Sequence, residues 1–148
     1  MKVIEHNIEI AAAPQAVWGV LTDADAYSEW NPFLTIDRAP VAVGDRLSVT
    51  IRPGRRKMTF RPTVTAFEPG REISWLGRVL APGVFDGAHT LALESLPNGH
   101  TRFCQREVFR GALVPLMKSV LRDTSDGFAA MNVALAARVQ SQAATGDV

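Results

Sequence analysis

Four tight turns divide the middle of the chain into short segments in which apolar and polar residues alternate. Each turn joins a proline, which fixes φ, to a glycine, which adopts positive φ, at Pro53-Gly54, Pro69-Gly70, Pro82-Gly83 and Pro97-Asn98-Gly99. Their spacing between residues 44 and 110 is typical of strands joined by hairpins. The middle of the chain therefore predicts an antiparallel meander.

The last of these turns also predicts a strand register. A three-residue loop at residues 97–99 places His89 opposite Glu107 and pairs Glu94 with Arg102. A two-residue loop would break this opposite-charge pair, so the cross-strand energies favour the longer loop. His89 and Glu107 are then expected to face each other on the inner side of the sheet. The earlier hairpins predict the pairs Val64–Trp75 and Ala66–Ile73, and either Val49–Met58 or Val49–Phe60, depending on the loop length.

After Gly111 the apolar residues recur at helical spacing. The stripe keeps its phase across the cluster from Asp123 to Gly127, although a glycine costs about 1 kcal/mol in a helix interior. We therefore expect one long helix, with room for a bend at this cluster, followed by a frayed tail at residues 141–148. The inner stripe is predicted to hold Leu116, Val120, Thr124, Phe128, Met131, Leu135 and Val139.

The first third of the chain predicts a strand and two short helices. Residues 2–10 alternate between apolar and polar, as a strand covered on one face does. Pro14 suits the first turn of a helix, because its missing N–H would have no partner there. Asp23 is placed to cap a second helix at residues 24–30, which Asn31-Pro32 then ends.

The composition predicts one domain, which the pattern of elements places at residues 1–140. A chain of 148 residues with 47% hydrophobic residues can bury one sizeable core, and a net charge of +1 gives no indication of nucleic-acid binding. The single Cys104 excludes an intrachain disulfide, and no Cys or His spacing suits zinc, so we expect no metal and no cofactor. The charged N-terminus and the lack of a long apolar run predict a cytoplasmic protein without integral membrane association, either a monomer or a homodimer.

The order of these elements, together with several short motifs, resembles the SRPBCC, or START-like, superfamily and its polyketide cyclase/dehydrase-like branch. The motifs are residues 29–33 (EWNPF), 69–75 (PGREISW), 85–89 (FDGAH) and 101–111 (TRFCQREVFRG). The resemblance covers nearly the whole chain and implies an α+β helix-grip fold, in which a curved antiparallel sheet of six to seven strands wraps around a long C-terminal helix. It also implies a cavity for hydrophobic molecules such as lipids, polyketides or aromatic compounds, and it transfers no catalytic set.

A cavity is also expected on physical grounds, because a strongly curved sheet cannot contact a straight helix along its whole length. The same residues can also fill the space as an ordinary hydrophobic core. Polar side chains on the inner face favour a space that holds water or ligand. The predicted ligand-binding residues are Phe60, Val64, Trp75, Leu91, Phe103, Gln105, Phe109, Thr124, Phe128 and Met131, with Trp30 and Phe33 at the mouth.

His89 and Glu107 are the candidate catalytic residues. A carboxylate beside an imidazole favours the imidazolium and tunes it as a general acid or base, and the alternative role is a structural polar pair that fixes the register. The leading hypothesis is binding of a hydrophobic, partly oxygenated molecule. The second is a cofactor-independent cyclase, dehydratase or isomerase that uses this pair. The third is a protein-interaction module resembling chaperone activators, for which a closed cavity and an exposed apolar patch would be evidence.

Overall fold

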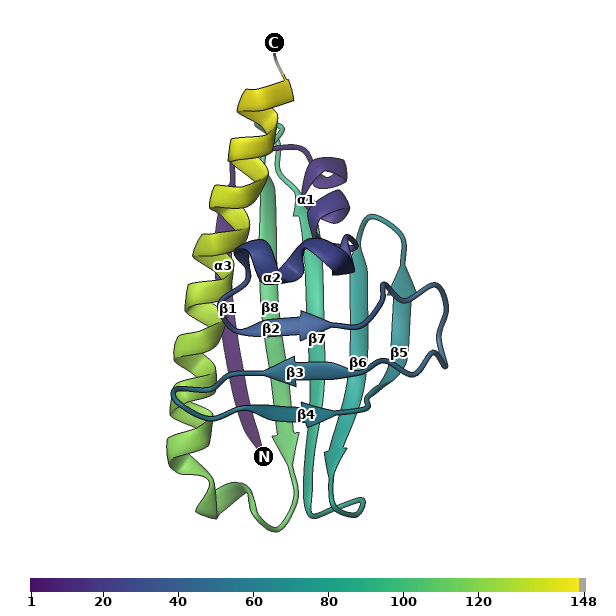
Figure 1. Ribbon diagram of the computed structural model, residues 1–148, viewed down its shortest axis with the longest axis vertical. Helices are drawn as coiled ribbons and strands as arrows, with labels where there is room; N and C mark the ends of the chain where they lie inside the picture. Colours follow the sequence, from purple (N-terminus) through teal and green to yellow (C-terminus); the bar gives the residue numbers. More distant parts are fainter. Residues whose placement is uncertain (147–148) are drawn as a thin grey trace.

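A five-stranded antiparallel sheet forms the back wall of the protein in the computed structural model, which describes residues 1–146 (Figure 1). The first strand of the chain lies at one edge of this sheet and pairs with the last strand, and a strand from the middle of the sequence lies at the other edge. Its order is β1 (Lys2–Ile10), β8 (Thr101–Arg110), β7 (Phe85–Ser95), β6 (Glu72–Val79) and β5 (Thr63–Glu68).

A second sheet of three short strands crosses in front of the first one (Figure 1). It consists of β2 (Leu34–Ile36), β3 (Val49–Ile51) and β4 (Met58–Phe60). The backbone N–H of Leu47 donates to Pro62 O at 3.0 Å, and an isolated bridge joins Arg46 to Thr63, so the two sheets are linked at one corner. The interior lies between the two sheets.

The long helix α3 (Lys118–Gly146) closes one side of this interior and packs against β1 (Figure 1). The short helices α1 (Pro14–Leu21) and α2 (Tyr27–Trp30) and the 3-10 turn η1 (Ala24–Ala26) cover the upper part. The helix-grip class is confirmed, although residues 1–146 form eight strands in two sheets rather than six or seven in one. Asp23 makes no capping hydrogen bond, so that part of the prediction was wrong.

The inner stripe of α3 agrees with the prediction over most of its length. Thr124, Phe128, Met131, Leu135 and Val139 are each at most 3% exposed. Leu116 is the error, because it falls in the 3-10 turn η2 (Val114–Leu116), whose tighter winding leaves it 79% exposed, and Leu121 is buried in α3 at 5%.

The cluster at residues 123–127, where the sequence left room for a bend, is continuous helix in α3. A Cβ at Gly127 would collide with the ring of Phe33, so the glycine leaves room for a side chain from the loop before β2. Phe33 also meets the ring of Phe128 at a centroid distance of 5.7 Å. This contact joins the first third of the chain to the helix.

The frayed tail predicted at 141–148 is wrong as far as residue 146, because α3 continues to Gly146. Val139 is 1% exposed and anchors the preceding turn, while the backbone N–H of Ala11 donates to Gln140 Oε1 at 3.4 Å. Alanine and glutamine favour helix, so an anchored helix extends through residues 140–144 at little cost. Residues 147–148 lie outside the described part.

The register of the last hairpin is confirmed, with His89 opposite Glu107 and an ion pair of 2.9 Å between Arg102 and Glu94. The other pairs are Val64–Trp75 as predicted, Val49–Phe60 as for the longer loop, and Phe67–Ile73 instead of Ala66–Ile73. The last difference follows from a β-bulge between Val64 and Ala66, which adds one residue to β5.

Candidate functional site

A hollow opens at the lower end of the interior, between the two sheets and the first turns of α3. It encloses about 450 Å³ of empty space, part of which is open to solvent. Its walls are mostly apolar with a few polar groups, which is typical of small-molecule sites. The lining residues are Ile51, Met58, Phe60, Gly77, Arg78, Val79, Phe85, Gly87, Glu107, Phe109, Val120 and Thr124.

The hollow is narrow. Only about 30 Å³ of it is wide enough for the centre of a water molecule. One water needs roughly 10–15 Å³ on this measure, so the space admits about two waters. A larger molecule would fit only if side chains of the wall moved aside, and Met58 and Phe60 are the half-buried side chains of the front sheet that line it.

Two strand glycines make this space. A Cβ at Gly87 would collide with Oε2 of Glu107, and a Cβ at Gly77 would lie 3.0 Å from the ring of Phe60. Neither glycine was predicted as a site residue. A glycine inside a strand often marks the close approach of another group, and that signal was present in the sequence.

The predicted ligand-binding residues divide into three groups. Phe60, Phe109 and Thr124 line the hollow, together with Glu107. Trp30 does not reach it, and lines a separate small hollow beside Arg138. The remaining residues pack above the hollow and are each at most 2% exposed: Phe33, Val64, Trp75, Leu91, Phe103, Gln105, Phe128 and Met131.

A chain of buried polar side chains leads from the hollow into this packed region. Glu107 Oε1 lies 3.4 Å from His89 Nδ1, and His89 Nε2 lies 3.0 Å from Gln105 Oε1. Gln105 Nε2 donates to Asn132 Oδ1 at 2.9 Å and faces the carbonyl of Phe128 at 3.5 Å. Gln105 was expected to contact ligand, but these bonds hold it inside the wall.

The chain of contacts fixes which nitrogen of His89 carries a proton. The carbonyl oxygen of Phe128 can only accept, so the amide nitrogen of Gln105 faces it and the amide oxygen faces His89. His89 Nε2 therefore donates. In a neutral imidazole Nδ1 is then an acceptor, and it faces Oε1 of Glu107 at 3.4 Å.

The pKa shifts favour the neutral forms of both His89 and Glu107. Burial lowers the pKa of His89 from 6.5 to about 4, although its hydrogen bond to Gln105 acts the other way. Burial raises the pKa of Glu107 from 4.5 to about 8. The expectation of an imidazolium beside a carboxylate was wrong, because both charged forms lose more solvation here than their attraction restores.

Two aromatic rings account for this loss of solvation. The imidazole of His89 lies between Trp75 and Phe128, with both centroid distances at 4.9 Å. His89 is 3% exposed, whereas the side chain of Glu107 is 12% exposed and lines the hollow. Glu107 is therefore the member of the pair that a bound molecule can touch, and His89 stands behind it.

The inner end of the polar chain is not satisfied. Asn132 is 3% exposed and its Nδ2 has no hydrogen-bond partner within the described part of the chain. Sequence reasoning missed Asn132, although an amide four residues after Phe128 lies on the same helical face. Across residues 1–146, no three His, Cys, Asp or Glu side chains are grouped to hold a metal ion.

Residues 52–57, here called the hairpin tip, join β3 to β4 and carry several basic side chains. The hairpin tip lies at the edge of the hollow and contacts α3. Arg56 forms a 2.7 Å ion pair with Asp123 and donates to Ser119 Oγ at 3.1 Å. Gly54 packs so closely on Asp123 that a Cβ would lie 2.7 Å from its carboxylate. The tip therefore fastens the front sheet to the start of α3.

Comparison with known proteins gives one family and many similar folds. The family described as polyketide cyclase/dehydrase and lipid transport matches residues 1–140. A comparison with curated proteins found no significant match. No helix within residues 1–146 is long and apolar enough to cross a membrane.

Three solved structures illustrate the likeness of fold. The Zhui aromatase/cyclase of a Streptomyces species is 16% identical, with a TM-score of 0.74 over 96% of this chain and 95% of that one. A hypothetical protein of Helicobacter pylori is 20% identical, with a TM-score of 0.75 over 93% and 88%. A START superfamily protein of Mycobacterium smegmatis is 17% identical, with a TM-score of 0.68 over 95% and 98%.

Proposed function

The chain belongs to the polyketide cyclase/dehydrase and lipid transport family, and on that premise we propose that it binds a small hydrophobic, partly oxygenated molecule in the hollow. The walls supply apolar surface from Phe60, Phe85 and Phe109, on three different strands. Burying about 300 Å² of apolar ligand surface at roughly 25 cal/mol per Å² yields about 7 kcal/mol before the costs of immobilisation.

The position of Glu107 is the observation that supports this proposal most directly. Thr124 donates its hydroxyl to Val120 O at 2.7 Å, and Arg78 is exposed and lies 3.8 Å from Asp86. Glu107 is thus the polar group at the inner wall that remains available to a ligand. A neutral carboxyl accepts from a hydroxyl or donates to a carbonyl, so a ligand of lipid, polyketide or aromatic type with one such group fits.

A series of naphthalene probes tests the proposal: naphthalene, 2-naphthol, 2-acetylnaphthalene and naphthalene-2-carboxylate, titrated by calorimetry. We expect 2-naphthol and 2-acetylnaphthalene to bind at least tenfold more tightly than naphthalene, because each pairs with Glu107. Naphthalene-2-carboxylate should bind more weakly than 2-naphthol and 2-acetylnaphthalene, because its charge is desolvated beside an apolar wall.

The Gly87→Ala variant is the decisive change, because its methyl group displaces the Glu107 carboxyl. We expect at least a tenfold loss of 2-naphthol affinity. Gly19→Ala is the matched control, since nothing lies within 4 Å of a Cβ at that position in α1. Equal affinities in the two folded variants would refute binding at this hollow.

A second candidate function is proton-transfer catalysis, and the raised pKa of Glu107 at the wall favours it. We propose that Glu107 donates its proton to the oxygen of a bound ketone, while a water molecule in the hollow takes a proton from the neighbouring carbon and passes one back to the Glu107 carboxylate, so that the enol forms and the carboxyl is restored. His89 is then a positioning residue, because its Nδ1 holds the carboxyl and it does not line the hollow.

Exchange of the methyl hydrogens of 2-acetylnaphthalene in heavy water, followed by NMR, tests this activity. We expect exchange to slow as the pH rises through about 8 and to be lost in Glu107→Gln. His89→Asn should move the pH profile while some exchange remains. Exchange at the rate of buffer alone, or unchanged in Glu107→Gln, would contradict catalysis.

The remaining expectations belong to the same proposal. We infer that the protein acts in the cytoplasm as a monomer or homodimer on a small molecule and not on nucleic acid, with the net charge of +1 as support. Size-exclusion chromatography and a DNA titration test the oligomeric state and the absence of nucleic-acid binding.

A further inference from the structure

Two neighbouring loops form an uncharged lower end of the molecule (Figure 1). Residues 80–84 join β6 to β7 and residues 111–117 join β8 to α3, and neither segment contains an acidic or basic side chain. The backbone N–H groups of Ala112 and Leu113 donate to Gly83 O and Val84 O, both at 3.0 Å. These hydrogen bonds hold the two loops together as one surface, here called the apolar end.

The apolar end exposes large side chains to solvent. Leu80 is 85% exposed and Leu116 is 79% exposed. Leu80 also has φ +70, and no other non-glycine residue of the described chain has positive φ. A bulky side chain is unfavourable in that conformation, and such strain persists mainly at sites with a function. Packing does not account for Leu80, because its side chain contacts mostly water.

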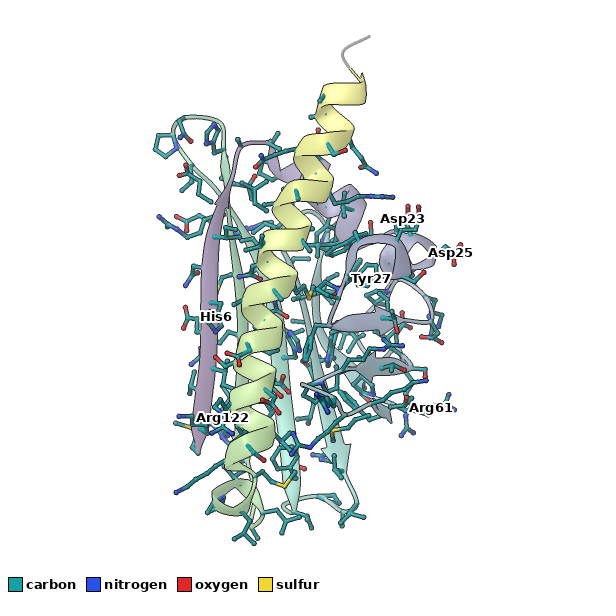
Figure 2. All side chains as sticks on the ribbon, turned by 60° about the vertical axis from the view of Figure 1, so that its left-hand side comes forward. His6, Asp23, Asp25, Tyr27, Arg61 and Arg122 are labelled. Carbon is teal, nitrogen blue, oxygen red and sulfur yellow. The ribbon has the colours of Figure 1, made fainter. Side chains whose placement is uncertain are left out.

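Unpaired cations adjoin the apolar end. A groove between β1 and the start of α3 is lined by Lys2, Lys118 and Arg122 together with Val114 and Pro115. None of the three cations forms an ion pair within the described residues. Figure 2 shows that Arg122 on α3 lies closer to the lower end of the molecule than His6 on β1 does. The groove also holds two acidic residues, Glu5 and Asp126, on its upper part.

We propose that the apolar end docks on an anionic lipid bilayer, with Leu80 and Leu116 inserted and Lys2, Lys118 and Arg122 against the lipid headgroups. Exposed apolar side chains flanked by free cations are the combination that binds the membrane interface. A stable protein–protein contact needs about 800 Å² per partner, and two loop tips at one extremity suit a deformable lipid layer better.

The hollow lies directly behind this surface. Val79 and Phe85, which flank the first loop, line it, as does Val120 near the start of α3. A docked molecule would therefore turn this end of the interior toward the lipid. The docking itself does not depend on ligand binding, because it is measured on vesicles with no ligand added.

Vesicle sedimentation of the full chain tests the proposal. We expect binding to an equal mixture of phosphatidylcholine and phosphatidylglycerol, and much weaker binding to phosphatidylcholine alone. Leu80→Gly should lower the partition constant about tenfold, because the inserted side chain is lost. The substitution does not endanger the fold, since glycine accepts φ +70. Lys118→Gln should lower the partition constant about fivefold.

The double variant Val41→Ser/Val43→Ser is the matched control. These valines are 73% and 62% exposed on the loop between β2 and β3, and we expect them to leave vesicle binding unchanged. Binding that is equal in Leu80→Gly and the unchanged protein would overturn the proposal. So would a failure to bind the anionic vesicles, or a dimer that forms without vesicles and is lost in Leu80→Gly, which would identify a protein contact instead.

Discussion

Strands β6 and β7 run through both the upper and the lower half of the interior, yet the upper half is solid and the lower half is hollow. In the upper half, the ring of His89 lies 4.9 Å, centroid to centroid, from both Trp75 and Phe128, and each of the three side chains is at most 3% exposed. In the lower half, Gly77 and Gly87 stand where such side chains would otherwise fill the space. One glycine in β6 and one in β7 therefore make the difference between the packed upper half and the hollow lower half.

The largest expected effect is a difference in stability between the two halves. Trp75→Ala should lower the free energy of unfolding by about 3–5 kcal/mol, because it empties a packed site. Phe60→Ala, which enlarges an existing space, should cost about 1–2 kcal/mol. Urea unfolding of both variants measures the difference. Equal losses would mean that the lower half is as well packed as the upper one.

The next effect is a pH dependence that comes from the pair joining the two halves. Glu107 stabilises the fold fully below its unfolded pKa of 4.5 and loses this contribution as the pH rises to about 8. His89 acts in the opposite direction between about 4 and 6.5, because its folded pKa is lowered. The two contributions offset each other up to about pH 6.5.

From pH 6.5 to about 8 the contribution of Glu107 is unopposed, so the free energy of unfolding should fall by about 2 kcal/mol. Glu107→Gln should abolish this fall, because the amide stays neutral. Denaturant curves at several pH values measure it. A flat profile in the unchanged protein would show that Glu107 is already ionised at neutral pH.

The smallest expected effect concerns the hairpin tip at the edge of the hollow. Removing the ion pair of Arg56 with Asp123 should cost only about 0.5–1 kcal/mol, because both side chains are partly exposed. A double-mutant cycle with Arg56→Ala and Asp123→Ala measures the pair. Stopped-flow binding of 2-naphthol should become faster in Arg56→Ala, since the tip then moves away from α3 more easily. An unchanged association rate would separate the tip from ligand entry.

The order of elements and the main hairpin register could be predicted because they depend on local chemistry. Proline and glycine fix the turns, and the Glu94–Arg102 pair selects one register out of two. The shift that pairs Ala66 with Ser74 instead of Ile73 could not be predicted, because a bulge is decided by packing of both sheet faces. Leu116 was misplaced because one 3-10 turn shifts the helical phase.

The candidate site was predicted only in part. The contact between His89 and Glu107 followed from the register, but their protonation depends on two aromatic rings that come from β6 and α3. The division between core and hollow depends on Gly77 and Gly87, whose role is visible only when Phe60 and Glu107 are placed beside them. Side-chain type indicated an inner face, and only the three-dimensional arrangement locates the empty part of it.

The pairing of β1 with β8 has a consequence for synthesis of the chain on the ribosome. Lys2 pairs with Phe109, so β1 meets β8, its strand partner within residues 1–146, after more than a hundred residues of further translation. At roughly 5–20 residues per second, that interval is about 5–20 s. During this time the isoleucines of β1 have no sheet to join, and a nascent-chain chaperone has its longest opportunity to bind there.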